Sequence, residues 1–487
     1  MCGRLLILLL GLTLCIACAK SSDPVAATTY NPPPPPPFDI NSINDTYPQL
    51  VSFDLHASWG PYNTHDPSII NNGDYYYCYS TDAAFGITVP PGIQIRRSKD
   101  LVQWDFMGWV FSGLPTMGSN FISQNGGTPN STLWAPYIMK VGSEYRLYYS
   151  LASSQPRLSV IGLATAASPL GPWTEKGLVV KSYNNTFLQT NAIDPTVVVT
   201  PSGEHWMYYG SAWDGIYHLA LDPVSGLAKT AGDIGKRIAQ RGFTSGKING
   251  NIEGPEIIYN QQQNKYYLFI AYDWLETKYN VRVGRADSPD GPFLDFNGHD
   301  INLEEDHGPM IIAPYQFEGH GGWQGTSHCA VFQNNGQYYI AHQGRPGVNF
   351  YYMVLHVRKL FWTKDGWPVA SPERYAGTEQ TSIAISELTG TWERIELDYQ
   401  MVPGFSAEQT SPDFQVASDF ILAADGSVNG DPTTTWTYRA PWLRFRSSAT
   451  TDSVFVERAR DWENKKAASI IFTGLNSLGT AVWGKKK

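Results

Sequence analysis

Cysteine is scarce in this sequence, and its few copies are poorly placed for cross-linking. Only 5 of the 487 residues are Cys, and Cys2, Cys15 and Cys18 fall within the first 18 positions. The other two, Cys78 and Cys329, stand far apart inside apolar runs. Beyond the first 18 residues there is no CxxC spacing, which argues against a disulfide framework and a zinc site. We therefore expect Cys78 and Cys329 to be buried thiols.

Charge is also sparse, and no excess of basic residues is present. Charged residues make up 16% of the chain, with 35 Lys and Arg against 44 Asp and Glu, for a net charge of −9. This balance argues against a protein that binds nucleic acid through a broad basic surface. The 13% aromatic content excludes a disordered chain. Abundant Gly, Pro, Tyr and Trp instead favour short strands joined by tight turns, with aromatic faces suited to sugar rings.

Long apolar runs are missing except at the amino terminus. Arg4 precedes an apolar run from Leu5 to Ala17, shorter than the roughly 20 residues that span a bilayer. Its end, Cys15-Ile16-Ala17-Cys18, resembles a bacterial lipobox. We expect residues 1–17 to be a signal peptide and Cys18 to be lipidated, anchoring an exported protein at the bacterial outer membrane or cell surface. Plain secretory cleavage, giving a secreted or periplasmic protein, is the alternative.

A proline-rich linker follows, at residues 18–39. Pro32 to Pro37 are six consecutive prolines, which favour a polyproline II spacer. This spacer would hold a folded part away from its anchor.

An aromatic strand preceded by a turn recurs five times along the chain. Its markers, Tyr76, Tyr148, Tyr208, Tyr267 and Tyr339, are spaced by 72, 60, 59 and 72 residues. Such a period fits one blade of four short strands. The sequence therefore predicts an all-β protein, with a five-bladed β-propeller at residues 40–377. Residues 378–487 lack the repeat and predict a small C-terminal β-sandwich or β-barrel.

A short motif, which contains Pro in four of the repeats, lies 10 to 14 residues before each marker. We expect these motifs to begin the innermost strand of each blade, because Pro is tolerated at the first residue of a strand. Their characteristic residues would then ring the propeller axis at equivalent positions. In chain order these residues are Asp66, Trp134, Asp194, Glu253 and His328.

Three carboxylates around one narrow axis point to a particular chemistry. Like charges repel at short range unless one group is protonated or a cation is near. Glycoside hydrolysis uses one protonated carboxyl group as acid and one ionised carboxylate, and a third charge can tune the acid. A ring of acids holding a hard cation such as calcium is the other interpretation.

The axis motifs, together with a phrase in the fifth repeat, resemble glycoside hydrolase family 43, and within it the two-domain endo-arabinanases. The resemblance implies a five-bladed propeller and an inverting mechanism. It also implies that Asp66 is the general base, Glu253 the general acid, and Asp194 the carboxylate that tunes and orients the acid. The motifs that carry the resemblance are His65-Asp66-Pro67-Ser68, Trp134-Ala135-Pro136, Ile193-Asp194-Pro195, Glu253-Gly254-Pro255 and Leu355-His356-Val357-Arg358-Lys359.

The resemblance extends to a metal and to substrate contacts. It implies a calcium ion near His328, held mostly through water, whereas a buried His bonded to a backbone carbonyl is the alternative. Trp134 and Trp213 are candidates for stacking on arabinose rings. Ser211 and Arg345 are further candidates for binding the substrate.

The leading hypothesis is hydrolysis of internal α-1,5-linkages in arabinan and arabino-oligosaccharides by a monomer that meets the membrane only through its lipid anchor. An exo-acting α-L-arabinofuranosidase or β-xylosidase on the same scaffold is one alternative. A non-catalytic glycan-binding lipoprotein is another, and it predicts loss of one of the three acids. All three are present.

Overall fold

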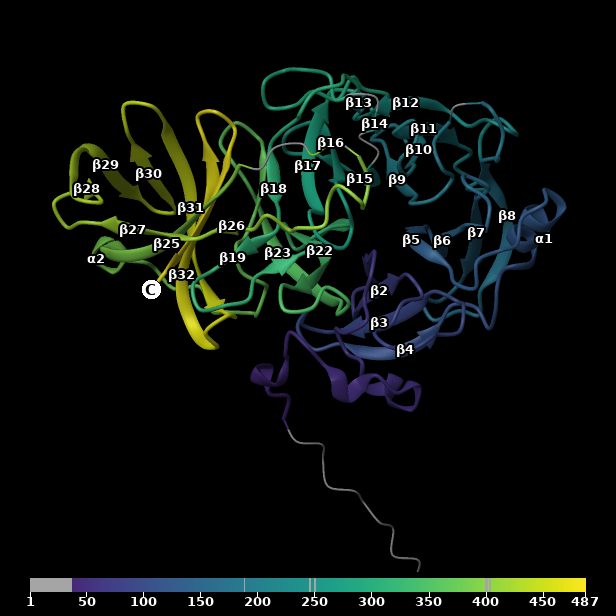
Figure 1. The fold of residues 1–487 in the computed structure, drawn as a ribbon, viewed down its shortest axis with the longest axis horizontal. Helices are drawn as coiled ribbons and strands as arrows, with labels where there is room; N and C mark the ends of the chain where they lie inside the picture. Colours follow the sequence, from purple (N-terminus) through teal and green to yellow (C-terminus); the bar gives the residue numbers. More distant parts are fainter. Residues whose placement is uncertain (1–36, 188, 245–246, 249–250, 399–401, 403) are drawn as a thin grey trace, which may run out of the picture. The chain divides into compact units, whose positions relative to one another are not determined.

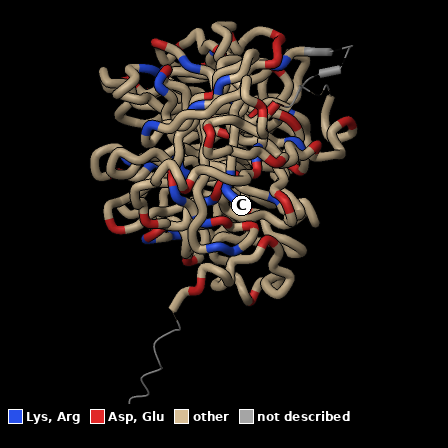
Figure 2. Tube along the Cα trace, turned by 90° about the vertical axis from the view of Figure 1, so that its left-hand side faces the viewer, with Lys and Arg blue, Asp and Glu red and all other residues tan. Residues whose placement is uncertain are grey.

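The computed structural model describes residues 37–187, 189–244, 247–248, 251–398, 402 and 404–487. The predicted signal peptide, Cys18 and most of the linker at 18–39 lie outside the described residues. Residues 40–487 form one compact unit. Among the described residues, none of the helices has the length and apolar character needed to cross a membrane. Figure 2 shows acidic and basic residues interspersed along the trace.

Residues 68–181 contain two four-stranded antiparallel sheets whose strands pair in sequence order (Figure 1). Three short 3-10 helices precede them: η1 (Ile40–Ser42), η2 (Pro48–Leu50) and η3 (Phe53–Ser58). The first sheet contains β1 (Ser68–Asn71), β2 (Tyr76–Ser80), β3 (Gln94–Ser98) and β4 (Asp105–Trp109). The second contains β5 (Trp134–Val141), β6 (Glu144–Leu151), β7 (Val160–Ala166) and β8 (Thr174–Lys181).

Two further sheets repeat this meander and give the chain its propeller-like arrangement (Figure 1). A two-stranded hairpin, β13 (Phe243–Thr244) and β14 (Lys247–Ile248), separates them in sequence. The third sheet contains β9 (Thr196–Val199), β10 (His205–Tyr209), β11 (Ile216–Leu221) and β12 (Lys236–Ala239). The fourth contains β15 (Ile252–Asn260), β16 (Lys265–Tyr272), β17 (Asn280–Ala286) and β18 (Met310–Ile312).

The tight turns predicted before each aromatic strand are present. Tyr76, Tyr148, Tyr208, Tyr267 and Tyr339 are buried and lie on the second strand of their sets. Gly73, Gly142 and Gly203 in the preceding turns have φ values of 102°, 60° and 85°. These angles suit Gly because an L side chain is strained there. Local turn chemistry therefore sets the hairpins that the sequence repeats.

The fifth repeat differs from the prediction, because it does not form a separate four-stranded sheet. Its strands are β21 (Cys329–Asn334), β22 (Gln337–Pro346), β23 (Val354–Trp362) and β24 (Pro368–Ala370). They pair antiparallel in chain order. However, β22 is ten residues long, and beyond β21 its free edge pairs with β20 (Trp323–Gln324). β20 continues through β19 (Tyr315–Gln316) to β26 (Gln415–Val416), which makes a seven-stranded sheet.

The predicted C-terminal β-domain is a closed barrel. β33 pairs with both β32 and β25, so the sheet has no free edge. The inward-facing side chains include Trp392, Phe420, Phe472 and Val482, all of them buried. The barrel strands are β25 (Gly390–Leu397), β27 (Ser418–Leu422), β28 (Ser427–Val428), β29 (Asp431–Arg439), β30 (Trp442–Arg446), β31 (Thr451–Asp461), β32 (Lys466–Asn476) and β33 (Ala481–Lys486).

Two short α-helices interrupt the β-structure of the described residues. One of them, α1 (Thr116–Gln124), was not predicted from the sequence and buries Gly118, Phe121 and Ile122 against the rest of the fold. Two and a half turns offer too few repeats for a visible helical period. The other helix is α2 (Ile385–Leu388), just before the barrel.

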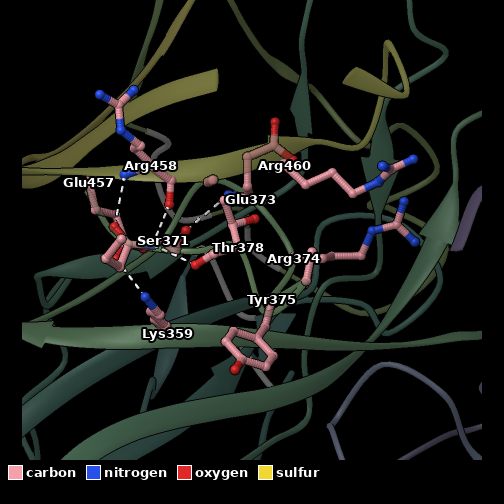
Figure 3. A pocket seen from close by; sticks show the side chains of 12 residues that line it. Lys359, Ser371, Glu373, Arg374, Tyr375, Thr378, Glu457, Arg458 and Arg460 are labelled. Carbon is pink, nitrogen blue, oxygen red and sulfur yellow. Dashed lines mark hydrogen bonds and ion pairs between the residues drawn. The ribbon is translucent and has the colours of Figure 1, made fainter. Parts of the chain in front are cut away.

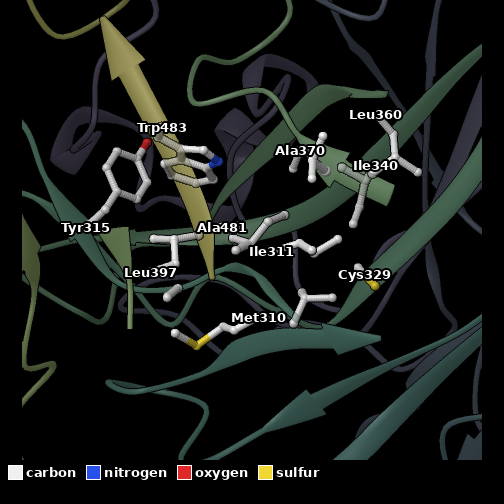
Figure 4. Close-up of a cluster of buried hydrophobic side chains, with 14 of the residues drawn as sticks. Met310, Ile311, Tyr315, Cys329, Ile340, Leu360, Ala370, Leu397, Ala481 and Trp483 are labelled. Atoms are coloured by element: carbon white, nitrogen blue, oxygen red, sulfur yellow. The ribbon is translucent and has the colours of Figure 1, made fainter. Parts of the chain in front are cut away.

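Apolar side chains from the propeller-like part and the barrel share one buried cluster (Figure 4). Met310 and Ile311 of β18 and Ile340 of β22 belong to it, together with Leu397 of β25 and Trp483 of β33. The Cys78 and Cys329 thiols are buried and free, as predicted.

Ion pairs also join the two parts. Lys359 of β23 lies 2.7 Å from the Glu457 carboxylate of β31 (Figure 3). Lys485 of β33 lies within 3.0 Å of three carboxylates, those of Glu373, Asp461 and Glu463, and all four side chains are almost fully buried. Despite burial, these neighbouring negative charges raise the pKa of Lys485 far above its usual value. The ammonium group is therefore a fixed counter-ion for three buried acids.

We predict that Lys485→Met greatly lowers the free energy of unfolding. The substitution keeps the bulk of the side chain but leaves three buried acids without their cation, which costs about 3–5 kcal/mol. Urea denaturation followed by tryptophan fluorescence measures the change. Lys466→Met is the matched control, because Lys466 is half exposed and 3.9 Å from Asp461. Equal stability of the two variants would contradict the role of Lys485.

Candidate active site

The residue before proline has the same unusual backbone conformation in all four Pro-containing axis motifs. The φ values are 52° at Asp66, 20° at Ala135, 58° at Asp194 and 55° at Gly254. Proline disfavours helical angles at the residue before it, and positive φ strains any residue but Gly. Three of the four residues are not Gly, and recurrence of the strained conformation there shows that the surrounding contacts impose it.

The contacts that hold this conformation run from sheet to sheet around the axis. Each pre-proline N–H donates a hydrogen bond to a side chain from the preceding set of strands. We call this set of bonds the amide ring. Its bonds are Asp66 N to Gln343 Oε1 (3.0 Å), Ala135 N to Thr81 Oγ1 (2.7 Å), Asp194 N to Ser150 Oγ (3.0 Å) and Gly254 N to Asp194 Oδ2 (3.2 Å).

The ring also corrects the predicted equivalence of the three acids. Asp66 and Asp194 are pre-proline residues, and their counterpart in the fourth sheet is Gly254, not Glu253. Glu253 stands one residue earlier in the motif, at the position of Trp134. The acids at the axis therefore occupy two different positions of the repeated motif: Asp66 and Asp194 stand directly before proline, and Glu253 stands one residue earlier.

One cavity of about 390 Å³ brings Asp66, Asp194 and Glu253 together. The predicted residues Trp134, Ser211, His328 and Arg345 also line this cavity. Trp213 is not among the lining residues; its ring is 39% exposed and lies 5.3 Å from the Arg157 guanidinium. The structure therefore brings together all of the predicted site residues except Trp213.

Asp66 is held in its ionised form. Thr81 Oγ1 donates to Asp66 Oδ2 at 2.6 Å, His65 Nδ1 lies 2.7 Å from the same oxygen, and His328 Nδ1 lies 3.5 Å from Oδ1. Burial alone would raise the pKa of Asp66, but the two imidazoles and the Thr81 hydroxyl hold it well below its usual value. An ionised carboxylate in this position can accept a proton from water.

The surroundings of Glu253 shift its pKa in the opposite direction. Tyr279 O–H donates to Glu253 Oε1 at 2.8 Å, and Ser211 Oγ–H donates to Oε2 at 2.7 Å. These hydrogen bonds favour the ionised form, but burial, helped by the charge of Asp66, raises the pKa of Glu253 above its usual value. The two donors fix the carboxyl group, and its buried surroundings make it release its proton less readily than an ordinary Glu does.

Asp194 is coupled to Glu253 through the amide ring. It accepts the N–H of Gly254, the residue next to Glu253, and is only 5% exposed. Burial first, and then the negative charges of Glu253 and Asp66, raise the pKa of Asp194 well above its usual value. Asp194 and Glu253 therefore hold a proton more tightly than ordinary carboxyl groups do.

Sequence reasoning missed Tyr279, Thr81 and Asp82 in this site. Tyr279 belongs to no repeated motif. Asp82 lines the cavity and accepts N–H groups from Gly92 and Leu133, and burial raises its pKa to about 7. A signal was available for Thr81, because hydroxyls also follow the aromatic strand at Ser150 and Ser211.

His328 is the candidate residue for a metal ion. Its ring is buried, and burial lowers the pKa of the imidazole, while the nearby Asp66 carboxylate opposes this shift. A Cβ on Gly254 would lie 2.6 Å from His328 Nδ1, so Gly is needed for this approach. Among the described residues, the acidic cluster with metal-like spacing is Glu373, Asp461 and Glu463, which contacts Lys485 instead. Around His328, the described residues therefore form no cluster of three metal-ligating side chains.

Comparisons with known proteins agree with this site. The chain is 27% identical over 475 residues to extracellular endo-α-(1→5)-L-arabinanase 2 of Bacillus subtilis, covering 87% of this chain and 93% of that protein. It is 29% identical to extracellular exo-α-(1→5)-L-arabinofuranosidase ArbA of Cellvibrio japonicus, covering 63% and 86%. The crystal structure of an endo-1,5-α-L-arabinanase from Thermotoga petrophila has the same fold, with a TM-score of 0.73, 24% identity, and coverage of 88% and 98%.

Family models divide the chain as the fold does. Residues 372–484 match the C-terminal lipocalin-like domain that accompanies such enzymes, in agreement with the closed barrel. Residues 60–368, which contain every cavity residue described above, match the model of glycosyl hydrolases family 43. The chain belongs to glycosyl hydrolases family 43.

Proposed function

We propose that this protein hydrolyses internal α-1,5-L-arabinofuranosidic bonds in arabinan with inversion of configuration. The proposal rests on two carboxyl groups in one cavity whose pKa values are shifted in opposite directions. The pKa of Asp66 is lowered, which favours its ionised form, and the pKa of Glu253 is raised, which favours its protonated form. An inverting glycosidase needs this combination. The relative from Bacillus subtilis, which matches along most of both chains, carries the endo-arabinanase name.

In this mechanism, Glu253 gives its proton to the glycosidic oxygen as the bond to the anomeric carbon breaks. Asp66 accepts a proton from the water that attacks the anomeric carbon from the opposite face. Asp194, next in space to Gly254, keeps Glu253 protonated and oriented. Trp134, Ser211 and Arg345 on the cavity wall, together with Trp213 outside it, bind the arabinose units.

Exo-action is the second candidate, since ArbA carries an exo-arabinofuranosidase name. That relative matches 63% of this chain, whereas the endo-arabinanase matches 87% and includes the C-terminal part. The longer match favours endo-action. A glycan-binding protein without activity would not need the proton arrangement at Asp66 and Glu253.

We further propose that β21–β24 acts as the fifth blade. The N–H of Asp66 in the first set of strands donates to Gln343 of β22, which links the last repeat to the first. In the fourth sheet, Glu256 accepts hydrogen bonds from Thr196 at 2.8 Å and from Val331 N of β21 at 2.9 Å. The set β21–β24 is therefore hydrogen-bonded to the first set through β22 and to the fourth sheet through β21.

Export to the cell surface, lipidation at Cys18 and a monomeric state are also part of the proposal. Export is supported by the extracellular names of the relatives from Bacillus subtilis and Cellvibrio japonicus. The Cys15-Ile16-Ala17-Cys18 phrase supports lipidation. A calcium ion near His328, when bound, would add positive charge beside the imidazole that faces Asp66.

Wild-type protein is predicted to release arabino-oligosaccharides, with little free arabinose at first, from debranched arabinan. Asp66→Asn and Glu253→Gln should each lower kcat by at least about 100-fold, because each removes one proton-transfer group. Chromatography of the products and reducing-sugar assays measure both effects, with xylan as the control substrate. Arabinose as the sole early product would show exo-action, and near-normal turnover by either variant would refute the assignment.

We predict that Asp194→Asn moves the alkaline limb of the kcat/KM profile to lower pH. Activity requires a protonated Glu253, so this limb reports the pKa of Glu253 in the free enzyme. Asp194 and Glu253 ionise as an interacting pair, in which a charge on either carboxyl group opposes ionisation of the other. Replacing Asp194 with a neutral amide removes this repulsion and lowers the pKa of Glu253. Rates between pH 4 and 10 measure the shift, and Asp233→Asn outside the cavity is the control. An unmoved alkaline limb would show that Asp194 does not tune the acid.

Calcium is predicted to raise the Tm of the wild-type protein, because a ligand that binds only the native state stabilises it. The same addition should leave the Tm of His328→Ala unchanged. Removing calcium with a chelator should lower wild-type kcat by about tenfold or more, and restoring calcium should reverse this loss. An equal response of both proteins to calcium would place the ion elsewhere.

A further inference from the structure

A segment from the C-terminal part of the chain reaches the loop that carries Tyr279. This crossing segment, residues 404–413, lies between β25 and β26 in the sequence. It contacts the loop of residues 273–279, which connects β16 and β17 in the fourth sheet. Asn251 Nδ2, beside this loop, also donates to Gly404 O at 3.3 Å.

Gln409 makes the central contact between the crossing segment and this loop. Its Oε1 accepts the Trp274 N–H at 2.6 Å, and its backbone oxygen accepts the Thr277 hydroxyl at 2.5 Å. Its Nε2 lies within hydrogen-bond distance of Asp273 Oδ1 (3.3 Å) and Val402 O (3.0 Å). Gln409 is fully buried. Because a buried amide is costly unless it is hydrogen-bonded, this set of partners fixes one orientation of the side chain.

A short chain of hydrogen bonds leads from Gln409 to the general acid. Gln409 holds the N–H of Trp274, and the carbonyl oxygen of Trp274 accepts the N–H of Tyr279 at 3.1 Å. The Tyr279 hydroxyl then donates to Glu253 Oε1 at 2.8 Å. The loop also brings Leu275 to the cavity wall. Displacing the loop would therefore move a hydroxyl that fixes the acid.

A second contact anchors the crossing segment directly beside Tyr279. Lys278 is almost fully buried, and its ammonium group forms an ion pair with Asp413, whose side chain is 60% exposed. The Tyr279 carbonyl oxygen in turn accepts the Thr326 N–H and hydroxyl, each at 3.1 Å. The loop is thus held from the crossing segment on one side and from residues before β21 on the other.

We infer that Gln409 is a positioning residue for Glu253, acting through Trp274 and Tyr279. This gives the C-terminal part a role in the chemical step of the proposed reaction, on which the inference rests. The chain of contacts orients the donor to Glu253 and does not touch the sugar. Its loss therefore lowers the rate of glycosidic oxygen protonation more than it weakens substrate binding.

The test is a double-mutant cycle of Gln409→Ala with Tyr279→Phe on linear arabinan. We expect Gln409→Ala to lower kcat by about 10- to 100-fold, with KM changed by less than about threefold, because small displacements of catalytic groups have effects of this size. Since both residues act along one path, the double variant should be no slower than Tyr279→Phe alone. Additive losses in the cycle would overturn the inference.

Two further variants separate positioning from folding. Gln380→Ala is the matched control, because among the described residues the Gln380 amide bonds Thr378 O, Arg458 O and Arg458 N, away from the fourth sheet. Its kcat should equal that of the wild type. Asp413→Asn removes the exposed anchor without emptying a buried site, and should lower kcat about two- to fivefold, non-additively with Tyr279→Phe. Gln409→Ala could instead have a lower Tm but the same kcat as the wild type at temperatures below unfolding. That result would show that Gln409 has only a structural role, and it would contradict the inference.

A substrate with a good leaving group tests whether Gln409 acts through the general acid. Nitrophenolate leaves with little need for proton donation, so Gln409→Ala should lose far less rate on a nitrophenyl arabino-oligosaccharide than on arabinan. Equal losses on both substrates would contradict action through the acid. If wild-type protein cleaves neither substrate, the proposed function fails; if it cleaves both and Gln409→Ala matches it, only the positioning role fails.

Discussion

The amide ring is the constraint on which the site depends. Four sets of strands contribute a pre-proline residue with positive φ, whose N–H is bound by a side chain from the preceding set. A residue with positive φ before proline persists only where its surroundings over-determine it. The strain and the hydrogen bonds together fix where Asp66 and Asp194 lie, and Asp194 in turn binds the backbone beside Glu253.

Three carboxyl groups share one cavity because different partners surround them. Two imidazoles and a hydroxyl surround Asp66 and favour its ionised form, whereas burial and the charge of Asp66 raise the pKa of Glu253 and of Asp194. Distinct environments thus divide similar side chains into a base and an acid, which is how one cavity can carry out both proton transfers.

The barrel is integrated with the catalytic part and not merely appended to it. It shares an apolar cluster around Trp483, a buried ammonium at Lys485, and the crossing segment that carries Gln409. The first two contacts stabilise the fold. The third reaches the loop bearing Tyr279, so a region without any cavity residue of its own still contacts the support of the acid.

Much of this protein could be predicted from its sequence, because hairpin turns and aromatic strands are local features that repeat. Turn glycines such as Gly73 and the spaced Tyr markers indicate the strand meanders, and the Asp-Pro and Glu-Gly-Pro motifs identify Asp66, Asp194 and Glu253. The long β22 that joins a larger sheet, and the partners Tyr279 and Gln409, were not predictable in this way. They depend on distances between residues far apart in the chain, and so do the protonation states, since these follow from burial and neighbouring charge. The local sequence determined where the strands form and which three acids stand in the motifs. Only the tertiary structure decided which of these acids holds its proton more tightly, because only in the folded protein do the acids meet their partners.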